Sequence, residues 1–145
     1  MKKNIKSILI VLVFFILLFS FLYINQNNKK IILNEKEFIV SVADTQAKQT
    51  KGLSFKKRMK ESRGMLFVFD EMKQNNFWMK DMNFPLDIIF FDENKKVVYV
   101  VSNVTPESYP ETFGGEVLSK YVLEINASLA EKYNIKIGDE FYFKN

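Results

Sequence analysis

Residues 87–101 read DIIFFDENKKVVYVV, two apolar runs separated by a polar stretch. The runs 87–91 and 97–101 are too short for typical helices and are rich in β-branched and aromatic side chains. Each therefore predicts a strand with both faces covered. The polar residues 92–96 have the length of a hairpin connection. This stretch predicts an antiparallel hairpin within a β-rich domain.

Further strand patterns lie on both sides of this hairpin. Residues 37–44 alternate, with Phe38, Val40 and Val42 on one face, which is typical of a half-buried strand. Residues 65–69 form another short, continuous apolar run. Two more strands are expected near the C-terminus, at residues 135–137 and 140–143, separated by a turn at Gly138-Asp139.

Two segments have the composition of short helices, at residues 45–53 and 126–134. The candidate capping residues are Asp44 or Thr45 and Gly52 for the first, and Asn126 and Asn134 for the second. Many short strands with one or two short helices predict a mainly β fold, either a β-sandwich or a partly closed barrel.

The N-terminus differs in composition from the rest of the chain. Residues 1–7 contain three lysines and no acid, and residues 8–24 are apolar apart from Ser20 and Tyr23. As a helix this run reaches roughly 25 Å, the short end of a transmembrane span. No pair of small residues suits a signal peptidase, so we favour an uncleaved signal anchor over a cleaved signal peptide. A buried core helix is disfavoured because the run is apolar on all sides.

This pattern predicts four parts: a basic cytoplasmic region at 1–7, a transmembrane helix at 8–24, a linker at 25–30 and a β domain at 31–145. Lysines before the span place the domain on the extracytoplasmic side, at the cell surface or in the periplasm. The membrane is thus the first expected partner, through residues 8–24.

Composition excludes several classes of chemistry. The 145 residues include no cysteine and no histidine, which removes disulfides, zinc fingers, cysteine nucleophiles and histidine acid-base catalysis. Of the 21 Lys and Arg residues, three precede the span, and the remaining 18 face 17 acids, a net charge of +1 for the domain. A nearly neutral domain lacks the excess of cations that binds nucleic-acid phosphates, so we expect no nucleic-acid partner.

Four charged residues lie within apolar surroundings, where a charge is buried only if it is paired: Arg58, Lys80, Asp87 and Glu124. Strand alternation places Lys80 on the same face as Trp78, which is the fifth candidate for a pocket. The alternative for this lone tryptophan, between Phe77 and Met79, is a core position. One hypothesis is a pocket in which Lys80 and Asp87, with Arg58 nearby, bind an anionic or hydroxylated ligand. The alternative is a buried ion pair that fixes strand register and has no other role.

A second hypothesis takes two carboxylates from Asp81, Asp87 and Glu124 for glycoside hydrolysis, which needs acids about 5 to 9 Å apart. Calcium is the remaining metal option, but residues 92–94 lack the spacing and glycine of a calcium loop. We therefore expect neither a metal nor a cofactor.

Several motifs occur in a fixed order along the chain: Gly52-Leu53, Arg58-Met59, residues 64–69 (GMLFVF), residues 77–80 (FWMK), residues 85–88 (PLDI), residues 121–124 (YVLE) and Gly138-Asp139. In these the chain resembles the bacterial and archaeal family called domain of unknown function 192 (DUF192), over about residues 31–143. The resemblance implies a jelly-roll-like β-sandwich, commonly behind a signal peptide or anchor. It implies no reaction, because the activity of the family is not established.

The chain departs from the family pattern in the hairpin. Lys95 stands where relatives carry glycine, so Asn94 is expected to adopt the positive φ instead. Asp81 adds a carboxylate beside Lys80, where relatives have asparagine.

Together these observations predict a membrane-anchored, extracytoplasmic module of the cell envelope that binds a small ligand or an envelope protein. The alternative is a small carboxylate-dependent hydrolase acting on envelope glycans. A structural accessory of an envelope complex is the third interpretation.

Overall fold

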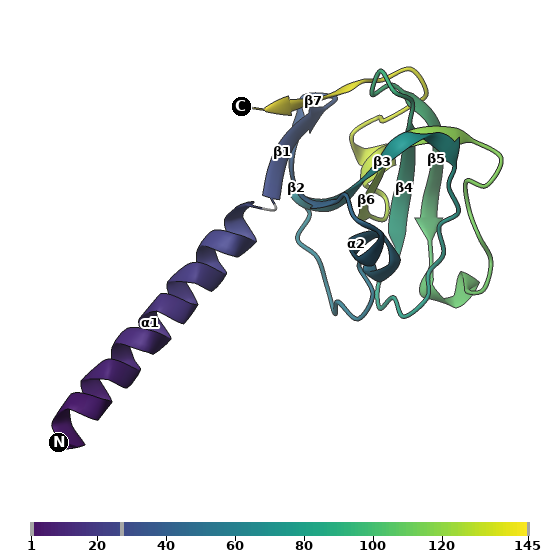
Figure 1. The fold of residues 1–145 in the computed structure, drawn as a ribbon. Coiled ribbons are helices and arrows are strands. Elements are labelled where there is room, and N and C mark those ends of the chain that lie inside the picture. Colours follow the sequence, from purple (N-terminus) through teal and green to yellow (C-terminus); the bar gives the residue numbers. More distant parts are fainter. Residues whose placement is uncertain (1, 27, 145) are drawn as a thin grey trace.

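A computed structural model describes residues 2–26 and 28–144, and the side chains of residues 6–19 and 28–144. Its β-rich body is one sheet of seven strands in the order β5-β4-β6-β3-β2-β1-β7 (Figure 1). The pair β2–β3 is parallel, and the other neighbours are antiparallel. The elements are α1 (Lys2–Gln26), β1 (Asn28–Leu33), β2 (Lys36–Ala43), α2 (Gln46–Lys51), β3 (Arg63–Gln74), β4 (Leu86–Phe91), β5 (Val97–Val104), η1 (Pro106–Ser108), β6 (Leu118–Asn126), α3 (Leu129–Lys132) and β7 (Phe141–Lys144).

The sheet curls until its two outer strands approach each other at one end. The backbone N–H of Val97, at the start of β5, donates to the carbonyl of Asp139 at 2.7 Å, and Phe141 N donates to the carbonyl of Lys95 at 3.1 Å. A bridge between Lys96 and Glu140 completes this contact. The mainly β prediction is confirmed, and the single curled sheet corresponds to the partly closed barrel rather than to two packed sheets.

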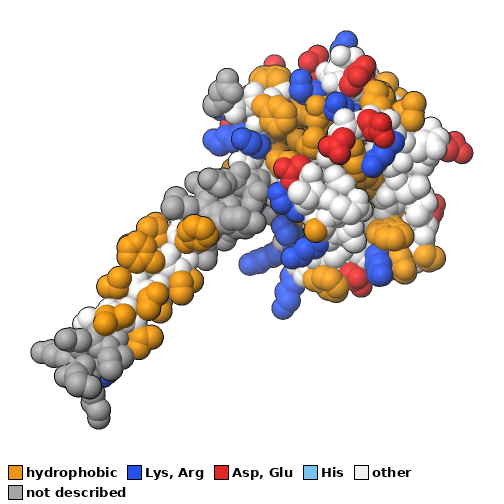
Figure 2. Space-filling view, in the orientation of Figure 1, with side chains coloured by type: hydrophobic (Ala, Val, Ile, Leu, Met, Phe, Trp, Pro, Cys, Tyr) orange, Lys and Arg blue, Asp and Glu red, His pale blue; other side chains and the backbone are white. Residues whose placement is uncertain are grey.

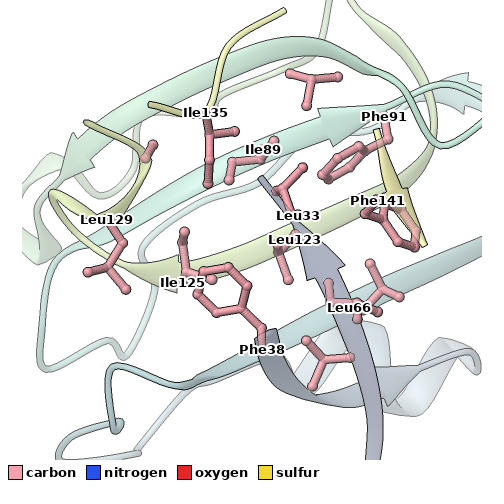
Figure 3. Close-up of a cluster of buried hydrophobic side chains, with 14 residues drawn as sticks. Leu33, Phe38, Leu66, Ile89, Phe91, Leu123, Ile125, Leu129, Ile135 and Phe141 are labelled. Atoms are coloured by element: carbon pink, nitrogen blue, oxygen red, sulfur yellow. The ribbon is translucent and has the colours of Figure 1, made fainter. Parts of the chain in front are cut away.

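The inside of the curl is filled by apolar side chains, which Figure 3 shows pointing toward one another. Strand β4 lies between β5 and β6 and is buried on both faces, as its continuous apolar sequence predicts. Ile89 and Phe91 face the inner cluster, whereas Ile88 and Phe90 belong to a second cluster on the outer face. The sheet therefore separates two hydrophobic cores, and the second one carries the site described below.

The predicted hairpin forms between β4 and β5, but its turn differs in detail from the prediction. Lys95 itself adopts the left-handed conformation, with φ 64°. The expectation that Asn94 takes this role is wrong. The Asp92 carboxylate accepts a hydrogen bond from Lys96 N at 2.9 Å, and Lys95 N donates to the Asp92 carbonyl at 3.2 Å. Asp92 thus fixes a turn that holds Lys95 at positive φ.

The first helix forms as predicted, with Thr45 as the N-cap and Gly52, at φ 50°, as the C-cap. The second helix begins later than predicted, because Asn126 is the last residue of β6 and pairs with Leu86 of β4. The N-cap of α3 is Ser128, at φ 66°. Residues 135–137 are not a strand, although Asn134 takes the expected left-handed conformation at φ 50°.

At the N-terminus, α1 ends at Gln26 and β1 begins at Asn28. Figure 1 shows α1 projecting from the β-rich body, and the apolar side chains from Ile8 to Phe19 are exposed, as the orange helix in Figure 2 shows. Within the described residues, no helix has both the length and the hydropathy that a membrane span requires.

Candidate functional site

A pocket of about 540 Å³ lies on the outer face of the sheet. Its walls are α2, strand β3 and the connection between β3 and β4, residues 75–85, and β6 contributes its base. The lining residues are Gln46, Gln49, Thr50, Lys51, Gly52, Leu53, Ser54, Phe67, Phe69, Lys73, Gln74, Asn75, Asn76, Phe77, Trp78, Lys80, Met82 and Glu124.

One wall is held by aromatic packing and backbone pairing. The ring of Phe77 packs edge-on against Phe67 at 4.8 Å and Phe90 at 5.7 Å between centroids. The backbone of Phe77 exchanges two hydrogen bonds with Phe113, of 3.0 and 2.8 Å. The next residue, Gly114, has φ 88°, and a Cβ there would meet the Phe90 ring at 2.2 Å, so a glycine is required. This wall is therefore rigid.

The opposite wall is fixed by the side chain of Gln49 in α2. Its Nε2 donates to the carbonyl of Val68 at 2.9 Å and to the carbonyl of Ala43 at 3.3 Å. The residues after α2 are joined to the connection: Ser54 Oγ donates to the carbonyl of Lys80 at 3.1 Å. Both walls are thus preorganised around the space between them.

Glu124 occupies the base of the pocket in an apolar setting. On the central strand β6 it lies between Met65 of β3 and Ile88 of β4, and its side chain is only 6% exposed. Its Oε2 has no hydrogen-bond partner among the described residues. Burial raises the pKa of this carboxyl from 4.5 to about 8, so it holds a proton at neutral pH. A buried, unsatisfied carboxyl costs stability and is a common sign of a functional site.

Around this base, the pocket lining presents lysines and an exposed aromatic ring. Lys51, Lys73 and Lys80 are its positively charged members. The Lys73 ammonium lies 4.9 Å from the centroid of the Phe69 ring. Trp78 is 53% exposed and packs edge-on against Tyr109 at 6.4 Å between centroids. The pocket therefore combines a protonated acid in its depth with cations and an indole.

The structure brings together three of the five residues that the sequence analysis singled out. Trp78, Lys80 and Glu124 line one pocket, whereas Asp87 and Arg58 do not. Arg58 is exposed on the segment between α2 and β3. Trp78 is likewise largely exposed and is not a core residue.

Asp87 is fully buried, but its partners are backbone amides instead of Lys80. Its carboxylate accepts hydrogen bonds from Asn103 N at 2.8 Å, Ser128 N at 3.2 Å and Ala130 N at 2.7 Å. The expected Lys80–Asp87 ion pair is not formed. Asp87 instead fastens the end of β5 and the start of α3 to β4, which is a structural role.

The arrangement for a glycosidase is also different from the expectation. Glu124 is the one acid among the described residues that line the pocket, and neither Asp81 nor Asp87 reaches it. In the described part of the chain, no group of acidic side chains is placed to hold a metal ion. The pocket lining offers groups for hydrogen bonding, stacking and charge pairing.

Sequence reasoning missed Gln49, Lys51 and Lys73. Lys73 was overlooked because the apolar run of β3 stops at Phe69, whereas the strand continues to Gln74. Lys51 belongs to a dense basic segment, residues 51–63, which the net charge of the whole domain does not reveal. Local charge density, read in windows, is the signal that would have found it.

Comparisons with known proteins agree with this fold. A protein from Sinorhizobium meliloti 1021, described with its crystal structure as "a putative transcription regulator", is 25% identical, with a TM-score of 0.75 over 80% of this chain and 93% of that chain. A protein of unknown function from Novosphingobium aromaticivorans DSM 12444 is 29% identical, with a TM-score of 0.75 over 79% of this chain and 84% of that chain. No curated protein matches. The family model DUF192, described as "Uncharacterized ACR", matches residues 28–143, and the chain therefore belongs to this family.

Proposed function

We propose that this protein is a binding module of the cell envelope that takes a small hydroxylated ligand into the pocket beside α2. A volume of about 540 Å³ is within the range of small-molecule sites. The pocket walls are already fixed by Phe77 and Gln49, so little ordering is needed on binding.

One observation carries this proposal: Glu124 lines the pocket, and the buried Oε2 of its carboxyl has no hydrogen-bond partner in the described structure. A protonated carboxyl donates one hydrogen bond and accepts others, which matches a hydroxyl group of a ligand. A bound hydroxyl would satisfy Oε2 if the carboxyl turned toward the pocket, and this hydrogen bond would offset part of the cost of burying the group.

The remaining lining suits the same ligand class. The exposed indole of Trp78 offers apolar surface to the C–H face of a sugar ring. Side-chain amides such as Asn76 supply both donors and acceptors for hydroxyl groups. Hydrolysis is not part of the proposal, because a second carboxylate is missing from the described lining.

For location, we propose that residues 8–24 anchor the protein in a membrane with the β domain on the extracytoplasmic side. The support is the sequence itself, an apolar run preceded by three lysines, together with the exposed apolar side chains of Ile8 to Phe19. Carbonate extraction of membranes and protease treatment of spheroplasts, whose periplasmic face is open to the enzyme, test this. Release of the chain by carbonate, or full protection from protease, would contradict it.

The ligand proposal is tested by screening the full chain, in detergent micelles, against an array of neutral and acidic oligosaccharides. Hits are then titrated by calorimetry with the wild type and with Glu124→Leu, which fills the same space without hydrogen-bonding groups. We expect binding by the wild type and none by Glu124→Leu. Glu93→Leu, an exposed position in the β4–β5 turn, is the matched control and should bind normally. An array without hits rejects the proposal.

A further inference from the structure

The charge of the pocket restricts its ligand more narrowly than the proposed function does. Its lining contains Lys51, Lys73 and Lys80 against the single acid Glu124. Glu124 is neutral at pH 7, because burial raises its pKa to about 8. The pocket is therefore positively charged at neutral pH, and a neutral ligand would leave this charge unused.

These three lysines are not committed to partners within the protein. The ion pairs found in the described residues involve Lys30, Lys48, Lys132 and Lys144, none of which lines the pocket. Lys73 instead lies over the Phe69 ring. Ammonium groups without a carboxylate partner are available to an incoming anion.

A basic segment continues this charge away from the pocket. Residues 51–63 contain six cations and one acid: Lys51, Lys56, Lys57, Arg58, Lys60 and Arg63, with Glu61. The carboxylate of Glu61 is already occupied, since it binds the Lys132 ammonium at 2.7 Å and the Tyr133 hydroxyl. Figure 2 shows Lys and Arg side chains gathered at the lower left of the body, where the segment between α2 and β3 runs in Figure 1.

The basic segment is fastened to the connection between β3 and β4, beside residues that line the pocket. Phe55 N donates to the carbonyl of Asp81 at 2.8 Å, and Asn83 Nδ2 donates to the carbonyl of Lys56 at 3.0 Å. The cations also act on one another: burial lowers the pKa of Lys56, and the charges of Arg63 and Lys51 lower it further. The basic segment thus lies beside the pocket, and the two share Lys51.

We infer that the ligand is an anionic saccharide, whose carboxylate is bound by Lys51, Lys73 and Lys80 while its hydroxyl groups reach Glu124. This inference rests on the proposed function and names its ligand class. In this arrangement the Glu124 carboxyl binds hydroxyl groups of the ligand, and the lysines bind its negative charge. A simple anion would pair only with the lysines, and a neutral sugar would hydrogen-bond only with Glu124.

The test compares three probes by calorimetry on the full chain in detergent micelles. They are a galacturonic acid trisaccharide, the same trisaccharide with methyl-esterified carboxylates, and citrate. The acid should bind about tenfold more tightly than the ester or better, and citrate should not displace it. Raising the salt concentration from 50 to about 500 mM should weaken binding of the acid and leave the ester unchanged.

Each contrary result has a distinct meaning. Equal affinity for acid and ester overturns the anionic ligand while the proposed function stands. Displacement by citrate at equal concentration overturns the saccharide and leaves a simple anion site. Failure of all three probes overturns this inference, and a neutral hit on the wider array would then keep the proposed function alone.

Single variants identify the cations responsible. Lys73→Gln and Lys80→Gln should each lower affinity for the acid about five- to tenfold and leave affinity for the ester unchanged. Lys136→Gln, an exposed lysine outside the pocket, is the control and should change neither. Because these positions are exposed, the variants should fold normally, and an unchanged melting temperature verifies this. Unchanged affinity for the acid in both pocket variants overturns the inference.

Discussion

Asp87 and Glu124 are both buried carboxylic acids on neighbouring strands, yet they sit in opposite environments. Asp87 of β4 lies opposite Ile125 of β6, and Glu124 of β6 lies opposite Ile88 of β4, so the two acids occupy adjacent registers and opposite faces of the sheet. Asp87 accepts three backbone hydrogen bonds, whereas Oε2 of Glu124 has none in the described structure. The sheet therefore places a structural acid on its inner face and an unsatisfied one on its outer face.

The difference arises from what covers each face. On the inner face, the start of α3 and the end of β5 present free N–H groups, which are the natural partners of a carboxylate. On the outer face, Glu124 is surrounded by aromatic and aliphatic side chains and by the pocket. Backbone amides satisfy the first acid, whereas the second has an oxygen without a partner in the described structure.

The strongest test of this comparison is Asp87→Ala. Removal of the carboxylate leaves the N–H groups of Asn103, Ser128 and Ala130 without their acceptor in a buried site. The free energy of unfolding should fall by about 3 to 5 kcal/mol, measured by denaturant titration of the full chain. Asp70→Ala, an exposed acid on β3, should change it by less than about 0.5 kcal/mol. A loss of unfolding free energy for Asp87→Ala as small as that of the control would show that these hydrogen bonds do not stabilise the fold.

The second test concerns pH and acts on Glu124 alone. Its pKa is raised by burial from 4.5 to about 8 in the folded protein, so the folded state binds the proton more tightly than the unfolded state. Between about pH 4.5 and 8, stability should therefore fall as pH rises, by up to about 1.4 kcal/mol per pH unit from this group.

The matched variant is Glu124→Gln, which keeps the shape and hydrogen-bonding groups but does not titrate. The difference in unfolding free energy between wild type and variant should grow steadily in favour of the variant from pH 5 to pH 8, and should level off above. A constant difference over this range would mean that Glu124 titrates normally and that its environment is wetter than the structure shows.

Local sequence patterns predicted most of the fold. Continuous apolar runs identified β3 and β4, and the caps Thr45 and Gly52 bounded α2. These features depend on neighbours along the chain, which a sequence displays directly. The closure of the sheet was not predictable, because it depends on backbone contacts between Val97 and Asp139, whose pairing leaves no local pattern.

Side-chain partners were predicted less well than positions. That Asp87 and Glu124 are buried follows from their apolar flanks, and both are buried. That Asp87 pairs with Lys80 does not follow, because a carboxylate accepts from backbone amides as readily as from a lysine, and those amides come from residues 16 to 43 positions away. The same reasoning was wrong for Arg58 and Lys80, which are exposed. Sequence identified two buried acids, and only the fold decided which partners they obtain.

The third test concerns Trp78, an exposed residue of the pocket on the outer face of the sheet. Its indole is 53% exposed and contributes little to the core, so Trp78→Ala should change the free energy of unfolding by less than about 1 kcal/mol. If the ring stacks on the ligand, the same variant should weaken saccharide binding about tenfold, measured by calorimetry. Tyr142→Ala, another exposed aromatic outside the pocket, is the control. A large loss of stability with normal binding would assign Trp78 to the scaffold instead.

The smallest effect is expected at Arg58, which the sequence pattern grouped with Lys80, Asp87 and Glu124. Arg58 is exposed and lies outside the pocket, so Arg58→Ala should alter stability by less than about 0.5 kcal/mol. It belongs to the basic segment, and loss of one solvated charge should lower affinity for an anionic trisaccharide by about twofold at most at 0.15 M salt. A loss as large as that of Lys80→Gln would show that the saccharide leaves the pocket and runs along residues 51–63. In that case a longer acidic oligosaccharide should bind more tightly than the trisaccharide, and the two measurements together would define how far the binding surface extends.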